Sequence, residues 1–310
     1  MTRILPFGPE AVAEAAALIL GGQPVALPTE TVYGLAADAT DAEAVARIYA
    51  AKGRPSFNPL IVHVPELEAA RRIASFDARA EALAATFWPG PLTLVLPARA
   101  DNGIARIASA NLPTVAIRVP VHPAIQAILK AAGRPLAAPS ANASGRISPT
   151  RAEHVRESLD GRIPLIVDAG PTGAGVESTI LAVRDAGVFL LRPGPVTEED
   201  VLRRTGVTIA TAKETGVSAP GQLASHYAPR KPVRLDAEEA RPGEWLIGFG
   251  AVAGDESLSP AGDPVEAAAR LFDALHRADA APGDAIAVAP VPEDGLGLAI
   301  NDRLRRAAVR

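Results

Sequence analysis

Short apolar runs alternate with segments of helical periodicity along the first two thirds of the chain. Short runs predict buried strands, whereas apolar positions three and four residues apart predict amphipathic helices. The predicted strands cover residues 24–28, 60–64, 92–96, 115–119, 136–138, 163–167, 179–183 and 188–191. The predicted helices cover residues 10–20, 40–53 and 122–132, with another from residue 150. The irregular spacing of the strands is unlike a repeat of βαβ units, so we expect an α/β domain with a mixed sheet.

Two of these helices carry a start signal. Thr40-x-x-Glu43 and Thr150-x-x-Glu153 have the spacing of a capping box, in which a hydroxyl and a carboxylate satisfy free backbone N–H groups. We therefore expect each helix to begin at its threonine, and the first to stop at Gly53.

The periodicity fades between residues 206 and 230, where Ala-Pro-Gly-Gln at 219–222 is typical of a linker. Strands are predicted again at 245–249 and 285–289, and helices from residue 263 and over 298–308. The chain thus divides into a larger, candidate catalytic domain over 1–205, a linker over 206–230 and a small α/β domain over 231–310.

Composition excludes several classes of protein. No apolar run approaches the roughly 18 residues of a membrane span, and the N-terminus lacks a signal-peptide pattern, so we expect a cytoplasmic protein without membrane association. The absence of cysteine excludes thiolate nucleophiles and disulfides, and the five histidines are scattered. We therefore expect no metal held by protein ligands, and any Mg²⁺ to be carried by phosphates.

Charge is unevenly distributed along the chain. Residues 1–230 contain 22 basic and 21 acidic side chains, whereas residues 231–310 contain 9 and 14. A stable nucleic-acid complex usually needs a basic excess that displaces counterions from the phosphates. We therefore do not expect this chain to bind RNA stably.

The segment 28–35, Pro-Thr-Glu-Thr-Val-Tyr-Gly-Leu, places hydroxyls and one carboxylate where a strand ends in a loop. Loops at strand ends are frequent ligand sites, although a capped turn around a buried tyrosine would have the same composition. The segment Lys52-Gly53-Arg54-Pro55 sets two cations on a stiff loop, which suits a triphosphate. A solvated helix end bearing Lys and Arg is the alternative.

The segment 138–150 is rich in small polar residues directly after a predicted buried strand. Ser140, Asn142 and Ser148 with free backbone N–H groups would suit phosphate, but such residues also simply form turns and N-caps. Arg118 and Arg192 end two strands, where each could bind a carboxylate or phosphate, or pair with a surface acid.

Several familiar site patterns are missing. The chain has no P-loop motif, no Gly-x-Gly-x-x-Gly after a strand, and no Gly-x-Ser-x-Gly elbow. His63 lies in an apolar run, where a lone histidine is more often a core residue than a catalytic base. A bound nucleotide would therefore need a different kind of site.

Together these segments resemble the YrdC-type threonylcarbamoyl-AMP synthases in their long, two-domain form. The resemblance extends from residues 28–35 to residues 299–303, and Lys52-x-Arg54 with Ser140-x-Asn142 resembles the family's paired signature. It implies a YrdC-like twisted mixed sheet with flanking helices, and a small Rossmann-like C-terminal domain.

The resemblance also implies two groups of binding residues. The L-threonine pocket would comprise Thr31, His63, Arg118, the Ala138 backbone and Ser178. The ATP contacts would be Lys52, Arg54, Asn58, Thr114, Ser140, Asn142, Ser148, Arg192 and Tyr227, with Lys52 and Arg54 as the catalytic pair. Tyr227 belongs to segment 225–229, which resembles the part of the linker that lies over the active site. Its alternative role is to anchor the linker in a surface groove.

The implied reaction joins L-threonine, bicarbonate and ATP, with Mg²⁺ on the triphosphate, and passes the product to a tRNA threonylcarbamoyl transferase complex. The C-terminal domain would serve in regulation or support the lid, without chemistry, so a chain ending at residue 230 should lose less activity than one ending before Gly206. Two alternatives stay open: an RNA-binding module and a carbamoyl-transferring maturation enzyme. The latter usually carries additional domains.

Overall fold

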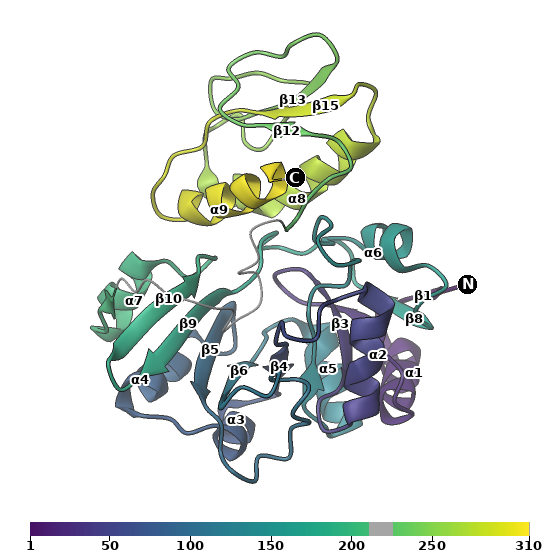
Figure 1. Cartoon of the computed structure of the whole chain (residues 1–310), viewed down its shortest axis with the longest axis vertical. Helices are drawn as coiled ribbons and strands as arrows, with labels where there is room; N and C mark the ends of the chain where they lie inside the picture. Colours follow the sequence, from purple (N-terminus) through teal and green to yellow (C-terminus); the bar gives the residue numbers. More distant parts are fainter. Residues whose placement is uncertain (211–225, 310) are drawn as a thin grey trace.

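The structure is a computed structural model, and it describes residues 1–210 and 226–309. Among these residues, no helix is both long and apolar enough to cross a membrane. Figure 1 shows two α/β domains, one above the other, with the N-terminus on the lower and the C-terminus on the upper. The α/β class with a mixed sheet and a small second domain, expected from the sequence, is confirmed.

The first domain contains one mixed sheet in the order β1-β8-β2-β3-β7-β4-β6-β5-β9-β10-β11. Its strands are β1 (Arg3–Pro6), β2 (Val25–Pro28), β3 (Tyr33–Asp38), β4 (Ile61–His63), β5 (Leu92–Pro97), β6 (Thr114–Arg118), β7 (Leu136–Ala137), β8 (Leu165–Asp168), β9 (Thr179–Arg184), β10 (Gly187–Arg192) and β11 (Ile209–Ala210). Its helices are α1 (Pro9–Leu20), α2 (Ala42–Lys52), α3 (Leu67–Ile73), α4 (Ala78–Phe87), α5 (Pro123–Ala132), α6 (Ala152–Leu159) and α7 (Glu198–Thr205).

Helices cover both faces of this sheet. Val25 and Leu27 of β2 pack with α1 and α5, whereas Ala26 between them packs with α2 and α6 on the opposite face. Successive side chains of a strand point to opposite faces, so a strand that is buried on both sides is apolar at every position. This is why the sequence shows β2 as a continuous apolar run.

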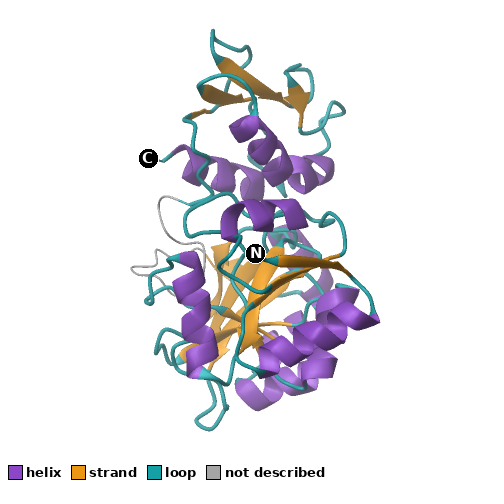
Figure 2. Ribbon diagram, turned by 90° about the vertical axis from the view of Figure 1, so that its right-hand side faces the viewer, coloured by secondary structure: helices purple, strands orange, loops and turns teal. Residues whose placement is uncertain are grey.

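The second domain is a small parallel sheet in the order β12-β15-β13-β14. Its elements are β12 (Val233–Arg234), β13 (Glu244–Gly248), β14 (Glu256–Ser257), α8 (Pro264–Ala280), β15 (Ala285–Val288) and α9 (Gly297–Ala308). Figures 1 and 2 show that α8 and α9 lie between this sheet and the first domain. The second domain therefore meets the first through helices.

Both predicted capping boxes are wrong. Helix α2 begins after Asp41, whose carboxylate accepts hydrogen bonds from the N–H groups of Glu43 (2.8 Å) and Ala44 (3.3 Å). The Thr40 hydroxyl instead donates to the Asp38 carboxylate at 2.7 Å. Helix α6 begins after Arg151, which forms no side-chain cap.

The predicted linker is shorter than its boundaries of 206–230 suggested. Strand β11 pairs in parallel with β10, so residues up to Ala210 belong to the first sheet. The motif at 219–222 and Ser225 lie outside the described residues. At the other end, Tyr227 is fully buried and packs with Phe272 of α8, so a chain ending at residue 230 would leave this side chain without its packing partner. The structure thus argues against the expectation that such a truncation does less harm.

The two domains are in close contact beside the linker. Gly175 has a φ of +69°, and a Cβ atom there would overlap the backbone of Ala268 and Ala269 in α8. The imidazoles of His154 in α6 and His276 in α8 stack with their centroids 3.8 Å apart. Such contacts join the domains by packing as well as by the connecting chain.

Candidate active site

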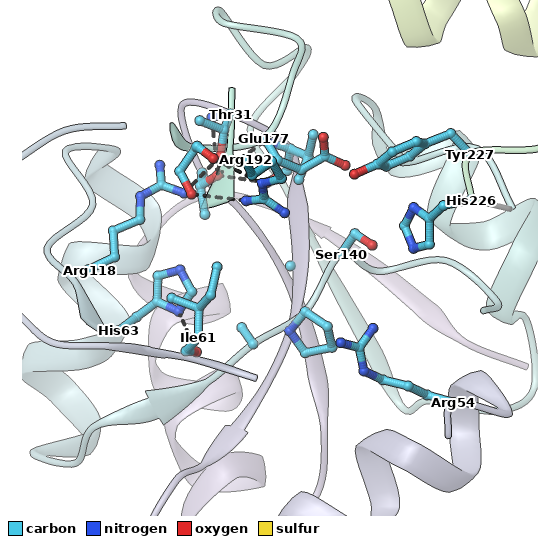
Figure 3. Close-up of a pocket in the computed structure, with 16 residues that line it drawn as sticks. Thr31, Arg54, Ile61, His63, Arg118, Ser140, Glu177, Arg192, His226 and Tyr227 are labelled. Atoms are coloured by element: carbon cyan, nitrogen blue, oxygen red, sulfur yellow. Dashed lines mark hydrogen bonds between the residues drawn. The ribbon is translucent and has the colours of Figure 1, made fainter. Parts of the chain in front are cut away.

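A cleft that is partly open to solvent lies where several strands of the large sheet end. Its lining comes from the loop between β2 and β3, the ends of β4, β6 and β10, the loop after β7, and the linker. Figure 3 shows these side chains pointing toward one space. The predicted site residues on its wall are Thr31, Arg54, His63, Arg118, Ala138, Ser140, Ser178, Arg192 and Tyr227.

Arg118 at the end of β6 is fixed by three protein oxygens. Its Nε donates to Gly90 O (3.1 Å), its Nη1 to Thr31 Oγ1 (2.9 Å), and its Nη2 pairs with Glu30 Oε1 at 2.5 Å. An arginine has five N–H donors, so two remain for a ligand. The guanidinium is almost completely buried, which makes it a preorganised binding group for a carboxylate.

Glu30 is a site residue that sequence reasoning did not single out. Its burial would raise the pKa of the carboxyl, but the charge and hydrogen bond of Arg118 lower the pKa below its usual value. Glu30 is therefore ionised at neutral pH, and its second oxygen accepts a hydrogen bond from Val121 N–H at 3.3 Å. It holds the Arg118 guanidinium in place.

Hydroxyl groups form the wall next to Arg118. The Thr29 and Thr31 hydroxyls lie 2.8 Å apart, and the Ser178 hydroxyl lies 2.7 Å from that of Thr93 in β5. Arg192 at the end of β10 donates from Nη2 to Ser178 Oγ at 3.1 Å. The site thus presents small polar groups that can recognise a hydroxyl-bearing ligand.

His63 is buried and also faces the cleft, so the alternatives of core residue and site residue are not exclusive here. Its Nδ1 lies 3.2 Å from Ile61 O, and since a carbonyl only accepts, this nitrogen carries the proton. Burial and repulsion from Arg118 lower the pKa of His63 to about 3. The ring is therefore neutral at physiological pH and leaves Nε2 as an acceptor.

Lys52 is neither on an exposed loop nor at a solvated helix end. It is the last residue of α2 and only 3% exposed, and its Nζ donates to the backbone oxygens of Ser140 (2.6 Å) and Asn142. Burial and repulsion from Arg54 lower the pKa of Lys52 well below its usual value. The helix end and the loop after β7 are thereby tied together beneath the cleft.

Arg54 is also buried, which corrects the picture of an exposed cationic loop. Its guanidinium donates to Asn58 O (3.2 Å) and Pro59 O (3.0 Å), and it lines the cleft. Burial lowers the pKa of Arg54 to about 10, so the side chain stays protonated at neutral pH. A buried, fixed cation of this kind attracts phosphate strongly.

Five of the proposed ATP contacts do not line the cleft that the described residues form. These are Lys52, Asn58, Thr114, Asn142 and Ser148. Thr114 begins β6 and so lies at the opposite end of that strand from Arg118. Asn58 is fully buried, and neither its Oδ1 nor its Nδ2 has a partner among the described residues. Asn142 Oδ1 is likewise unpaired. Buried amide atoms without partners are rare in folded proteins and often await a ligand or water.

Glu177 is a second wall residue that the sequence did not reveal. It is buried, and it accepts a hydrogen bond from Ser148 Oγ at 2.5 Å. The neighbouring linker brings His226 and Tyr227 against the same wall, with their rings 4.0 Å apart. Burial lowers the pKa of His226 to about 3, so this imidazole is also neutral at physiological pH. Among the described residues, no group of three or more His, Cys, Asp or Glu could hold a metal ion.

Comparisons with known proteins cover nearly the whole chain. A family model described as "Telomere recombination" matches residues 17–194, and one described as "Threonylcarbamoyl-AMP synthase, C-terminal domain" matches residues 196–309. The threonylcarbamoyl-AMP synthase of Bacillus subtilis (strain 168) is 42% identical over 322 residues, covering 96% of this chain and 92% of that protein. The threonylcarbamoyl-AMP synthase of Pyrococcus abyssi is 42% identical over 323 residues, covering 95% and 93%.

A solved structure gives the same result. The crystal structure of P. abyssi Sua5 complexed with L-threonine matches with a TM-score of 0.89 at 38% sequence identity. The match covers 99% of this chain and 98% of that chain, so both domains and their arrangement are included.

Proposed function

The chain belongs to the threonylcarbamoyl-AMP synthase family, and we propose that the cleft in Figure 3 is the site where it makes its product. The enzyme is a nucleotidyltransferase that forms L-threonylcarbamoyladenylate and pyrophosphate from L-threonine, bicarbonate and ATP, for the N6-threonylcarbamoyladenosine modification of tRNA. The resemblance found in the sequence is thus confirmed.

L-Threonine binds at the Arg118 end of the cleft in this proposal. Arg118 takes the carboxylate with its two remaining N–H donors, and Thr31 and Ser178 offer hydroxyls to the side chain. His63 Nε2 and the Ala138 backbone complete the pocket. The single observation that carries this assignment is the buried Arg118 guanidinium, which Thr31, Gly90 and Glu30 fix while two of its N–H donors remain for a ligand.

ATP binds at the opposite end. Arg54 and Arg192 are buried cations on the cleft wall, Ser140 adds a hydroxyl, and Tyr227 closes this end from the linker. Lys52 lies behind the wall, where it fixes the backbone of Ser140 and Asn142. A triphosphate with its Mg²⁺ would approach these groups from the cleft. The described residues offer no cage of carboxylates, which fits an ion carried mainly by phosphates.

The chemistry requires positioning more than a reactive side chain. The threonine amine attacks CO₂ and loses a proton, or attacks bicarbonate, whose C–O bond breaks with loss of water; either way the N–C bond of a carbamate forms. A carbamate oxygen then attacks the α-phosphate of ATP, a P–O bond forms, and the bond to the β-phosphate breaks with release of pyrophosphate. Fixed cations such as Arg54 stabilise the charge that develops on the phosphates, and their placement before reaction lowers the reorganisation cost.

Pyrophosphate release tests the proposal. Purified protein with ATP should release pyrophosphate only when L-threonine and bicarbonate are both present, and Arg118→Met should suppress the threonine dependence. Lys130→Met, an exposed position at the end of α5, serves as the control. Release that is equally fast without threonine would contradict the assignment.

Neither alternative function is favoured. The chain has a formal net charge of −4, which disfavours a stable RNA complex, and the comparisons match threonylcarbamoyl-AMP synthases along both domains. We further propose that the product is formed in the cytoplasm and passed to a tRNA threonylcarbamoyl transferase complex. A salt-dependent gel shift of tRNA without ATP would argue for direct RNA binding instead.

A further inference from the structure

A single arginine of the second domain reaches the wall of the cleft in the first. Arg303 on α9 is 0% exposed, and its Nε lies 3.1 Å from Glu177 Oε2. Its Nη1 donates to Pro193 O at 2.6 Å, and its Nη2 lies 3.4 Å from Glu177 O. A guanidinium so thoroughly buried and paired across a domain interface needs its partner, because an unpaired buried charge is strongly unfavourable.

Glu177 connects this arginine to Ser148. One carboxylate oxygen of Glu177 pairs with the Arg303 guanidinium, and the other accepts a hydrogen bond from the Ser148 hydroxyl at 2.5 Å. Burial would raise the pKa of Glu177, but Arg303 and Arg192 lower it below its usual value, so the carboxylate is ionised. A charged acceptor forms the stronger hydrogen bond, so Ser148 is held in one orientation.

The second domain contacts Ser148 at another atom as well. His276 on α8 lies with Nε2 3.2 Å from the backbone oxygen of Ser148. The side chain and the carbonyl of this residue are therefore both fixed by helices of the C-terminal domain, one directly and the other through Glu177.

Tyr227 is supported by the same two helices. Its ring lies 5.3 Å from that of Phe272 on α8, and the Arg303 guanidinium is 5.7 Å from its centroid. Its φ of 63° is in the left-handed region, which is unusual for a tyrosine and persists only where packing maintains it. In Figure 3 its hydroxyl points toward Glu177 and the cleft. That hydroxyl is buried without a partner among the described residues.

We propose that Arg303 is a positioning residue for ATP. Arg303 fixes Ser148 through Glu177 and contacts the ring of Tyr227, so that the C-terminal domain completes the nucleotide end of the active site. This inference rests on the proposed function, which assigns Tyr227 to the ATP end of the cleft, and on the family resemblance, which implies Ser148 as an ATP contact. It assigns the second domain a role in nucleotide affinity, beyond support for a lid. It predicts a smaller effect on L-threonine binding, because Arg118, Glu30 and Thr31 fix the carboxylate end of that pocket and only Ser178, which follows Glu177, connects it to Arg303.

The experiment compares Arg303→Met with Arg305→Met in the full-length protein. Both residues lie on α9, but Arg305 is exposed and pairs with Glu293 on the surface. Pyrophosphate release gives KM for ATP and kcat, and calorimetry without ATP gives the Kd for L-threonine. We expect Arg303→Met to raise KM for ATP at least tenfold while the Kd for threonine changes less than twofold. Arg305→Met should change neither.

Glu177→Gln provides an independent variant that keeps the volume and the second domain's packing. It should raise KM for ATP like Arg303→Met, and the double variant Arg303→Met/Glu177→Gln should be no worse than the worse single one, because both act through the same link. Arg303→Lys, which keeps a charge, should recover part of the loss. If Arg303→Met melts below the assay temperature, Glu177→Gln carries the comparison alone.

Several outcomes overturn the proposal. An unchanged KM for ATP in folded Arg303→Met or Glu177→Gln would do so, and so would an equal loss of ATP and threonine binding, which indicates a general structural effect. Additive losses in the double variant would show that the two residues act separately. Failure of the proposed function is distinct, since the unmodified protein would then release no pyrophosphate in response to threonine.

Discussion

Lys52→Met tests whether the buried lysine contributes to both stability and catalysis. The side chain is 3% exposed, and its Nζ donates to the backbone oxygens of Ser140 and Asn142. Methionine keeps most of the stem but leaves both carbonyls unpaired. Each unpaired buried group costs about 1–3 kcal/mol. The loss should therefore be at least about 2 kcal/mol.

This loss of stability can be measured by thermal unfolding. At about 2–4 °C per kcal/mol for a domain of this size, we expect the melting temperature to fall by roughly 4–8 °C. A lysine on an exposed loop could be removed without structural cost, and such a variant would stay folded. Its burial changes that expectation, so activity must be measured well below the lower melting temperature.

At such a temperature, kcat for pyrophosphate release should fall by roughly 100-fold or more. Lys52 lies behind the cleft wall and fixes the backbone of Ser140 and Asn142, and a misplacement of binding groups by about 1 Å can cost roughly 100-fold in rate. Lys130→Met at the exposed end of α5 should keep both the melting temperature and kcat. The reasoning is refuted if Lys52→Met melts like the unmodified protein or retains kcat within twofold.

Four further outcomes are expected. Arg118→Met should weaken L-threonine binding by roughly 10- to 100-fold in calorimetry, because hydrogen bonds to a charged group contribute about 1.5–3 kcal/mol. Valine should bind far more weakly than threonine to the unmodified protein, and equal affinities would exclude recognition of the hydroxyl. Burial lowers the pKa values of His63 and His276 from 6.5 to about 3, so both rings stay neutral in the folded protein but take up protons in the unfolded chain. Their contribution to stability is therefore complete above pH 6.5 and falls toward pH 3, by about 2 kcal/mol for each at pH 5. Thermal unfolding between pH 7.5 and 5 measures this fall, and a flat profile would count against their burial. Asp41→Ala should lower stability by about 1 kcal/mol without affecting activity, and a larger loss for Thr40→Ala would restore threonine as the cap.

Most of the sheet could be predicted because its strands are buried on both faces and stand out as apolar runs. Strand β3, over Tyr33–Asp38, was missed because Gly and Ala dominate it and neither favours a strand by itself. Only pairing with β2 and β7 makes it one. Helix α4 was also not predicted, although the sequence contains a signal for its start: Asp77 caps the helix and Glu81 lies in its first turn.

The site was predictable in its residue types but not in its electrostatics. Glu30 and Glu177 adjoin hydroxyls that the motifs had singled out, yet their partners Arg118 and Arg303 are 88 and 126 residues away. A local pattern contains no information about such pairings. The same holds for Lys52, whose burial depends on carbonyls 88 and 90 residues further along the chain.

The contact at Gly175 limits how the two domains can move relative to each other. Because the loop backbone lies directly on the backbone of α8 at Ala268 and Ala269, a shear motion along the helix axis would drive neighbouring side chains into the glycine. A hinge motion that lifts α8 away meets no such obstacle. A Gly175→Ala variant would therefore force the loop and α8 apart, because its Cβ would overlap the backbone oxygen of Ala268.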